Sequence, residues 1–291
     1  MSPEPSAGGW VGGSLRHPDD FRQVAIVDTG DLVRAYYPSA GLADAVVDVL
    51  AGAGIDVAHL TVQDLSAVDQ LHAGGAAATA LVLERISLTA GTTLLDVGCG
   101  LGGPSRMAAD KYQAQVTGVD LTPELVDAAN ALAARVGLEE RCRFMVTPGE
   151  ILPFEEHSFD SAMMIHVGMN VSDKRSVFAE VHRVLSPDSV FMLYEQVRSG
   201  AGDLVYPLPW AVDKRSSFVE TADEYVAALT AAGFVQIEVE DRTGPVPGAT
   251  PPSAQVGPAD ILGPAYAEGV TNHIAATRAG LLRGVLILAR A

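Results

Sequence analysis

In the stretch Thr93-Leu94-Leu95-Asp96-Val97-Gly98-Cys99-Gly100-Leu101-Gly102-Gly103, a short apolar run ends in a cluster of glycines. An apolar run of this length predicts a buried strand. Glycines after a strand let the backbone approach a ligand closely, and the N-terminus of a following helix presents free N–H groups. Gly98, Gly100 and Gly103 also match the G-x-G-x-x-G pattern of dinucleotide sites, which on its own is a weak signal.

Two acidic residues beside this cluster favour a different ligand. Asp96 stands two residues before the first glycine, where its carboxylate would repel a pyrophosphate but can hold the ammonium end of an amino-acid-like ligand. Asp120 ends the next apolar run, and an acid in that position suits the two hydroxyls of a ribose. A nucleoside that carries an amino acid is S-adenosylmethionine.

Further along the chain, apolar runs of strand length alternate with segments of helical periodicity. The predicted strands are 93–97, 115–120, 143–146, 161–165, 190–194, 234–239 and 284–288. The predicted helices include 24–50, 76–86, one that starts at Thr122, 173–185, 221–232 and 259–280. Strands that are apolar on both faces and alternate with helices indicate a parallel sheet covered on both sides. We therefore predict an α/β fold with a Rossmann-like, seven-stranded, mostly parallel sheet, helices on both faces and a helical N-terminal lid.

The same pattern predicts how the chain is organised. Residues 1–20 are rich in Gly, Pro and Ser and are expected to form a flexible arm. Residues 21–88 are expected to form a helical cap, and residues 89–291 the Rossmann-like domain. We expect an insertion at about 198–218 to act as a lid over the acceptor, and a long Pro/Gly-rich loop at 241–258.

Composition excludes several classes of function. The formal net charge is −17, and so acidic a chain is a poor ligand for nucleic acid or an anionic membrane. No apolar run reaches the length of a membrane span, and the N-terminus lacks a signal-peptide pattern. Two cysteines, Cys99 and Cys142, fit a reduced cytoplasm, and the histidines show no spacing typical of metal ligands. The sequence leaves open whether the chain forms a homo-oligomer.

Four motifs in order resemble those of class I S-adenosylmethionine-dependent methyltransferases. They are 94–103, 116–122, Leu152-Pro153-Phe154 with Ser158-Phe159-Asp160, and 183–187. A narrower resemblance, to the bacterial branch related to sarcosine/dimethylglycine and tocopherol methyltransferases, rests on 33–37, 69–75, 166–170 and 207–210. The resemblance implies methyl transfer from S-adenosylmethionine to a small-molecule acceptor at N, O or C. The high Ala and Gly content is associated with bacteria in which such enzymes tailor natural products.

The resemblance also assigns cofactor-binding residues. It places Asp96, Gly98 and Gly100 at the methionine end of the cofactor, Asp120 at the ribose and Leu121 at the adenine. Relatives carry Gly-Asp-Ala before the Leu-Pro-Phe stretch, whereas this chain has Thr147-Pro148-Gly149. The adenine contact must therefore come from the Gly149 N–H, from Glu150 or from water.

A loop ahead of the first strand is expected to cover the cofactor. The resemblance places Gln70 and His72 over its methionine part; the alternative is an ordinary polar loop.

Candidate catalytic and acceptor-binding residues follow the fourth and fifth strands. His166 is available as a base at neutral pH; the alternative is a histidine that only contacts the cofactor or caps a helix. Glu195 could bind a cationic acceptor or pair with His166; the alternative is a solvated strand-end acid. Met169 and Asn170 are expected at the floor of the acceptor pocket. The candidates for its lid are Tyr36, Tyr37, Tyr206 and Trp210.

Two other functions compete with methyl transfer. A nicotinamide-dependent oxidoreductase would use the G-x-G-x-x-G pattern, but Asp96 argues against it. A non-catalytic binding protein gains slight support from Pro148, against which stand the intact glycine cluster, Asp120 and His166.

Overall fold

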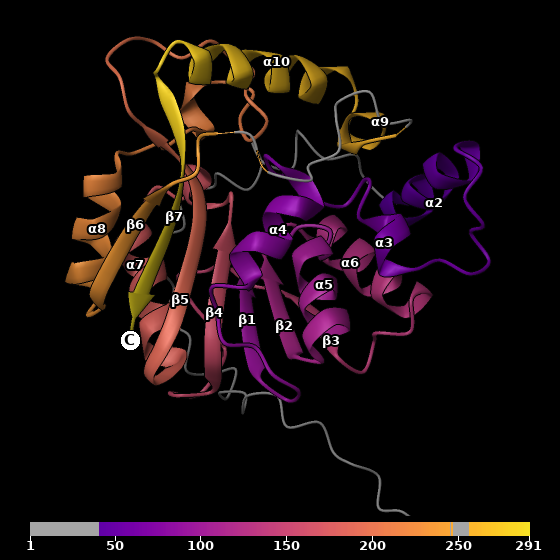
Figure 1. Ribbon diagram of the computed structural model, residues 1–291, viewed down its shortest axis with the longest axis horizontal. Coiled ribbons are helices and arrows are strands. Elements are labelled where there is room, and N and C mark those ends of the chain that lie inside the picture. Colours follow the sequence, from indigo (N-terminus) through magenta and orange to yellow (C-terminus); the bar gives the residue numbers. More distant parts are fainter. Residues whose placement is uncertain (1–40, 245, 247–255) are drawn as a thin grey trace, which may run out of the picture.

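A computed structural model describes residues 41–244, 246 and 256–291, and its centre is one seven-stranded sheet of order β3-β2-β1-β4-β5-β7-β6 (Figure 1). Strand β7 is antiparallel to both of its neighbours, and the other pairings are parallel. The strands are β1 Thr93–Val97, β2 Gln115–Asp120, β3 Cys142–Val146, β4 Phe159–Ile165, β5 Leu185–Arg198, β6 Val235–Asp241 and β7 Leu282–Arg290. This confirms the predicted mostly parallel sheet.

Helices cover both faces of the sheet, as predicted. Consecutive strand residues point to opposite faces, so Leu94 packs against α4, α5 and α6, whereas Leu95 packs against α7 and α8. Figure 1 shows α10 lying across the top of the sheet. The helices are α2 Leu42–Gly52, α3 Val62–Leu65, α4 Gly75–Leu83, α5 Gly103–Tyr112, α6 Pro123–Arg135, α7 Lys174–Val184, α8 Ala222–Ala231, α9 Pro258–Leu262 and α10 Pro264–Arg278.

Helix α2, the first described helix of the predicted cap, packs on α6, whereas α3 and α4 pack on α5. Val46 and Leu50 of α2 form a buried cluster with Leu132 of α6 and Ile261 of α9. Two segments far apart in the sequence thus share one apolar core. The predicted arm and the first part of the predicted cap, residues 1–40, lie outside the described residues, as does most of the loop predicted at 241–258.

Near the C-terminus, the helix predicted at 259–280 is two helices. The chain breaks at Gly263, whose φ of 82° lies in the left-handed region that glycine adopts without strain. Helix α10 then packs over the insertion predicted at about 198–218, which we call the segment under α10. Asn272 donates a hydrogen bond from Nδ2 to the Pro207 carbonyl oxygen at 3.0 Å. A Cβ atom on Gly269 would lie 2.7 Å from the Leu208 carbonyl carbon, so this helix and the segment are in close contact.

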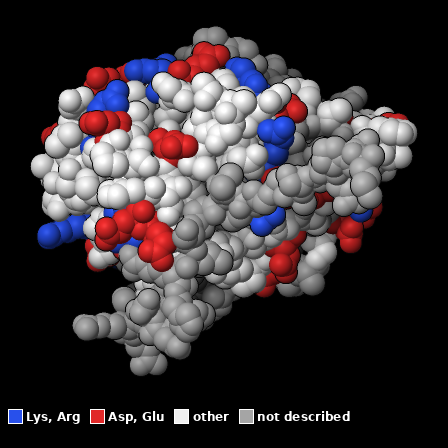
Figure 2. Space-filling view, turned by 90° about the horizontal axis from the view of Figure 1, so that it is seen from below, with Lys and Arg blue, Asp and Glu red and all other residues white. Residues whose placement is uncertain are grey.

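The surface agrees with the small number of basic residues. On the face seen in Figure 2, the described Lys and Arg side chains are scattered among Asp and Glu and form no continuous stripe. Among the described helices, none combines the length and the apolar character that crossing a membrane requires.

Candidate active site

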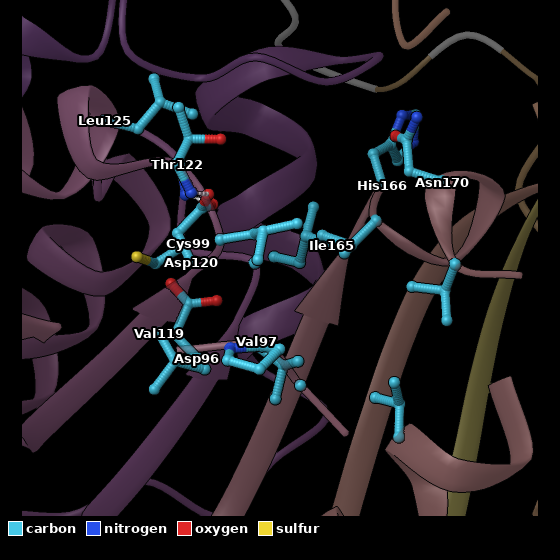
Figure 3. Close-up of a pocket in the computed structure, with 18 of the residues that line it drawn as sticks. Asp96, Val97, Cys99, Val119, Asp120, Thr122, Leu125, Ile165, His166 and Asn170 are labelled. Atoms are coloured by element: carbon cyan, nitrogen blue, oxygen red, sulfur yellow. Dashed lines mark hydrogen bonds between the residues drawn. The ribbon is translucent and has the colours of Figure 1, made fainter. Parts of the chain in front are cut away.

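A cavity of about 450 Å³ opens at the carboxyl ends of β1, β2 and β4 (Figure 3). Its walls are the glycine cluster, the loop 147–150, the loop 165–173 and the cap loop 69–72. Ten of the predicted site residues line it: His72, Asp96, Gly98, Gly100, Asp120, Leu121, Gly149, Glu150, His166 and Asn170. Gln70, Met169, Glu195, Tyr206 and Trp210 do not, and Tyr36 and Tyr37 lie outside the described residues.

The glycine cluster is shaped by close backbone contacts. Gly98 has a φ of 75°, and a Cβ atom there would lie 2.3 Å from Cγ2 of Val167. No side chain fits at that distance, so glycine is required where β1 leaves the sheet. The loop therefore rests directly on the loop that carries His166.

Asp120 closes the other side of the cluster. Its carboxylate accepts hydrogen bonds from the backbone N–H groups of Gly100 and Thr122, each at 2.9 Å. Burial raises the pKa of this carboxyl, while these N–H bonds act in the opposite direction. The carboxylate is thus fixed at the end of β2, with the glycine loop on one side and the start of α6 on the other.

Asp96 lies deeper in the same cavity. Its carboxylate accepts a hydrogen bond of 2.6 Å from the Ser105 hydroxyl at the start of α5. Burial raises the pKa of Asp96 to about 7; the Ser105 bond lowers it and the nearby Asp120 charge raises it. A buried acid that pairs with no cation among the described residues is well suited to receive an ammonium group.

His166 lies at the other end of the cavity, beside Asn170 (Figure 3). Its φ of 54° is left-handed, which is uncommon for a residue with a side chain. The ring contacts those of His72 and Tyr194, with centroids 5.6 and 5.0 Å away, and Nε2 has no hydrogen-bond partner among the described residues. Burial, aided by His72 and His273, holds the pKa of His166 well below its usual value. The imidazole is therefore neutral at pH 7.

Glu195 supports the turn that contains His166. Its Oε1 accepts hydrogen bonds from the backbone N–H groups of Val167 at 3.2 Å and Gly168 at 2.9 Å. The side chain is fully buried, and burial raises its pKa to about 8 against the effect of those two bonds. The structure thus places Glu195 behind the turn. It is neither solvated nor paired with His166, and it does not line the cavity.

The other predicted acceptor-binding residues join the turn after β4, which contains Met169 and Asn170, to the segment under α10, which contains Tyr206 and Trp210. Asn170 donates from Nδ2 to the carbonyl oxygens of Trp210 at 2.7 Å and Ser216 at 3.1 Å. Trp210 donates its own ring N–H to the Ser217 hydroxyl, and with Met169 it joins a buried cluster against which Tyr206 packs. These residues hold the segment to the His166 loop, and of them only Asn170 lines the cavity.

Three residues that sequence reasoning missed also shape the cavity: Asp69, Ser105 and Arg106. Asp69 lines it and pairs with Arg106 at 2.8 Å, and both side chains are buried. Asp69 precedes Gln70 within a motif already quoted, so a signal for it existed. Nothing in the spacing of Asp69 and Arg106 indicates that they meet.

Metal ligands do not gather in this part of the molecule. The described residues contain no group of three or more His, Cys, Asp or Glu side chains that could hold an ion. Cys99 and Cys142 are free and buried, and burial raises the pKa of both thiols, that of Cys142 to about 12. Neither thiol is therefore activated as a nucleophile.

The sheet order, the antiparallel β7 and the cavity over a glycine cluster with two strand-end acids define a Rossmann-like nucleoside-binding fold. Residues 95–193 match the family model of the methyltransferase domain, so this part of the chain is a methyltransferase domain.

Comparisons with individual proteins agree. Methyltransferase GfsG of Streptomyces halstedii is 30% identical over 181 residues, which are 61% of this chain and 65% of that protein. The 24-methylenesterol C-methyltransferase 2 of Arabidopsis thaliana is 33% identical over 117 residues, 40% of this chain and 32% of that protein. A crystal structure of geranyl diphosphate C-methyltransferase from Streptomyces coelicolor A3(2) has a TM-score of 0.64 at 18% identity, covering 91% of this chain and 98% of that one.

The narrower resemblance is confirmed, because proteins named as tocopherol or sarcosine/dimethylglycine methyltransferases are also among the matches. The match covers between about a third and a half of the length of the sterol methyltransferases that the chain resembles. The solved structure at 18% identity shows the fold alone.

Proposed function

We propose that this protein is an S-adenosylmethionine-dependent methyltransferase that acts on a small molecule. The observation that carries the proposal is the arrangement of Asp96, the glycine cluster and Asp120 around one cavity. Asp96 is buried and pairs with no cation in the described part of the chain, Asp120 ends β2, and Leu121 offers an apolar wall beside it. These are the features that an amino acid, a ribose and a purine require of one site.

Each residue has a distinct part in holding the cofactor. Asp96 would bind the ammonium group, and Asp120 the ribose hydroxyls. Leu121 would pack on the adenine. Pro148 lines the cavity beside Gly149 and Glu150, which are left to supply polar contacts to the purine. When bound, the cofactor supplies a methyl group on a sulfonium and a thioether as leaving group.

His166 is the residue that we propose to act on the acceptor. Its neutral imidazole can take a proton at Nε2 while the acceptor atom is held in line with the methyl group. Glu195 acts through it, by holding the turn in which His166 has its left-handed backbone. The rings in contact with His166 are those of His72 and Tyr194, and neither carries a negative charge at neutral pH. An acceptor with an uncharged reacting group, such as a hydroxyl, fits this end better than an ammonium ion.

The acceptor is proposed to be a natural product or its precursor. The sterol and tocopherol methyltransferases among the relatives, by their names, support a small molecule as substrate. The free, buried cysteines and the net charge of −17 support a reduced, cytoplasmic setting and argue against a nucleic-acid substrate.

Calorimetric titration with S-adenosylhomocysteine and with NADH tests the proposal. We expect binding of S-adenosylhomocysteine only. Asp120→Ala should weaken it by about 1.5–3 kcal/mol, the range for hydrogen bonds to a charged group. Binding of NADH instead would favour the oxidoreductase, and an unchanged affinity of the variant would remove Asp120 from the site.

A further inference from the structure

Arg106 is a completely buried cation in the first turn of α5. Its Nη2 donates to Oδ2 of Asp69 at 2.8 Å and to the Leu101 carbonyl oxygen at 2.6 Å. Its Nη1 donates to the Ala129 carbonyl oxygen at 3.2 Å. One side chain therefore joins the cap loop, the glycine cluster and helix α6.

The cap loop continues this network into the cavity. Oδ1 of Asp69 accepts a hydrogen bond from Nε2 of Gln70 at 3.0 Å, which orients the Gln70 amide. Oε1 of Gln70 in turn accepts the Thr79 hydroxyl at 2.6 Å. Nε2 of His72 lies 2.9 Å from the same hydroxyl oxygen. Leu71 and His72, which line the cavity, are thus held at the end of a chain of bonds that starts at Arg106.

Backbone packing leaves this loop no room to shift toward α5. A Cβ atom on Gly103 would lie 2.5 Å from Nε2 of Gln70 and 2.6 Å from Oδ1 of Asp69. The loop therefore rests on the first turn of the helix that follows the glycine cluster. The spacing between the cap loop and the glycine cluster therefore depends on this contact.

The ion pair also makes Asp69 and Asp96 differ in their readiness to bind a ligand ammonium. Asp69 and Asp96 both line it, but Asp69 is paired with a cation and Asp96 is bonded to the neutral Ser105 hydroxyl. Of these two acids, Asp96 is therefore the one without a cation partner among the described residues, because Arg106 compensates the charge of Asp69.

We propose that Arg106 is a positioning residue for the cofactor: by binding Asp69 and the Leu101 carbonyl oxygen, it holds the cap loop 69–72 at a fixed distance over the glycine cluster. Arg106 itself does not line the cavity. The inference rests on the proposed function, since S-adenosylhomocysteine is the ligand whose binding reports it.

The test compares Arg106→Met with Arg183→Met. Arg183 is a matched control, because it also pairs with a carboxylate, Glu180, and donates to two backbone carbonyl oxygens. Affinity for S-adenosylhomocysteine is measured by calorimetry at 10 °C, after circular dichroism has shown both variants to be folded. We expect Arg106→Met to raise Kd by ~10-fold, within the range found for residues that act without touching the ligand. Arg183→Met should lower the melting temperature but leave Kd within about twofold, since its partners lie outside the cap loop.

Hydrogen exchange of residues 65–75 provides a second readout. S-adenosylhomocysteine should slow exchange there in the wild type and in Arg183→Met, and much less in Arg106→Met. If Arg106→Met does not fold, Asp69→Asn, which keeps the shape and loses the charge, is measured by the same two criteria.

Three results would overturn or redirect the inference. A folded Arg106 variant with wild-type Kd and wild-type ligand-dependent exchange overturns it, as does an equal loss of affinity in Arg183→Met. A wild type that binds no S-adenosylhomocysteine would instead remove the proposed function, and this inference with it.

Discussion

At the scale of single residues, burial sets the charge of the groups that face the cavity. His72 and His166 are kept neutral, with the pKa of His72 lowered to about 4 by burial. The Asp96 carboxyl has a pKa of about 7, so it titrates near neutral pH. The two ends of one cavity are therefore chemically different. The Asp96 end is suited to a positive charge, whereas the His166 end presents neutral imidazoles.

The first prediction concerns pH and Asp96. Only the ionised carboxylate attracts an ammonium, so affinity for S-adenosylhomocysteine should be present above the pKa and lost as the pH falls through about 7. The ionised fraction of such a group rises about tenfold between one unit below and one unit above its pKa, so Kd should fall about tenfold from pH 6 to pH 8. Calorimetry at the two pH values measures this.

Asp96→Asn is the control for that titration. Its side chain cannot ionise. The Kd of the variant should therefore be higher than that of the wild type at pH 8 and close to that of the wild type at pH 6. A wild-type affinity that does not change over this range would show that Asp96 does not hold the ammonium.

At the scale of elements, the cavity is assembled from loops that hold one another. Val167 rests on Gly98, Glu195 binds the backbone after His166, and Asn170 ties that loop to the segment under α10. Lys174 continues the attachment, because its Nζ donates to the Phe218 carbonyl oxygen at 2.8 Å. A change in the segment under α10 would thus be transmitted to the His166 loop.

The second prediction is that Asn170→Ala loosens this attachment. The carbonyl oxygens of Trp210 and Ser216 would lose their donor, at a cost of about 1–3 kcal/mol in the free energy of unfolding. Hydrogen exchange of residues 204–218 should become faster, and cofactor affinity should change little because the methionine end of the cavity is intact.

Asn130→Ala is a suitable comparison, since Asn130 also donates from Nδ2 to two carbonyl oxygens, those of Val126 and Phe144. It should destabilise the protein to a similar extent without faster exchange at 204–218. Unchanged exchange there in Asn170→Ala would mean that other contacts hold the segment.

At the scale of the whole molecule, charge opposes compactness. The net charge is −17, and its repulsion is screened by salt. We therefore expect the melting temperature at pH 8 to rise by ~2 °C between 20 and 500 mM NaCl, the shift that ~1 kcal/mol produces in a chain of this size. Differential scanning calorimetry measures it. At pH 5, where more carboxyl groups are protonated, the increase should be smaller; an equal increase at both pH values would point to a general salt effect instead.

Much of the fold, and the side of the cavity that Asp96, the glycines and Asp120 form, could be predicted because these features depend on residues close together in the sequence. The run from Thr93 to Gly103 contains strand, turn and helix start within a few residues, so Asp96 and the glycines are placed by their own neighbours. Asp120 reaches the same edge because β1 and β2 are parallel and in register, with Val97 opposite Val119. Periodicity likewise located the strands, whose ends differ from the predicted ones by a few residues.

Glu195 shows where local information ends. The sequence predicted that the fifth strand ends at Glu195, whereas β5 continues to Arg198, and alternate residues of a strand face opposite sides of the sheet. Which N–H groups lie opposite the carboxylate depends on the path of the chain after β4, and that path brings Val167 and Gly168 to it. In the same way, α10 covers Trp210 from far along the chain, so an aromatic side chain expected at the acceptor packs within a core.

The strand–glycine–helix unit, the two acids that line the cavity and the mostly parallel sheet could be predicted from the sequence, because each follows from residues that are neighbours along the chain or along adjacent strands. The ion pair of Arg106 with Asp69, the burial of Glu195 behind the turn and the lowered pKa of His166 could not be predicted in this way. Those outcomes depend on which groups are excluded from water together, and burial is a property of the assembled molecule.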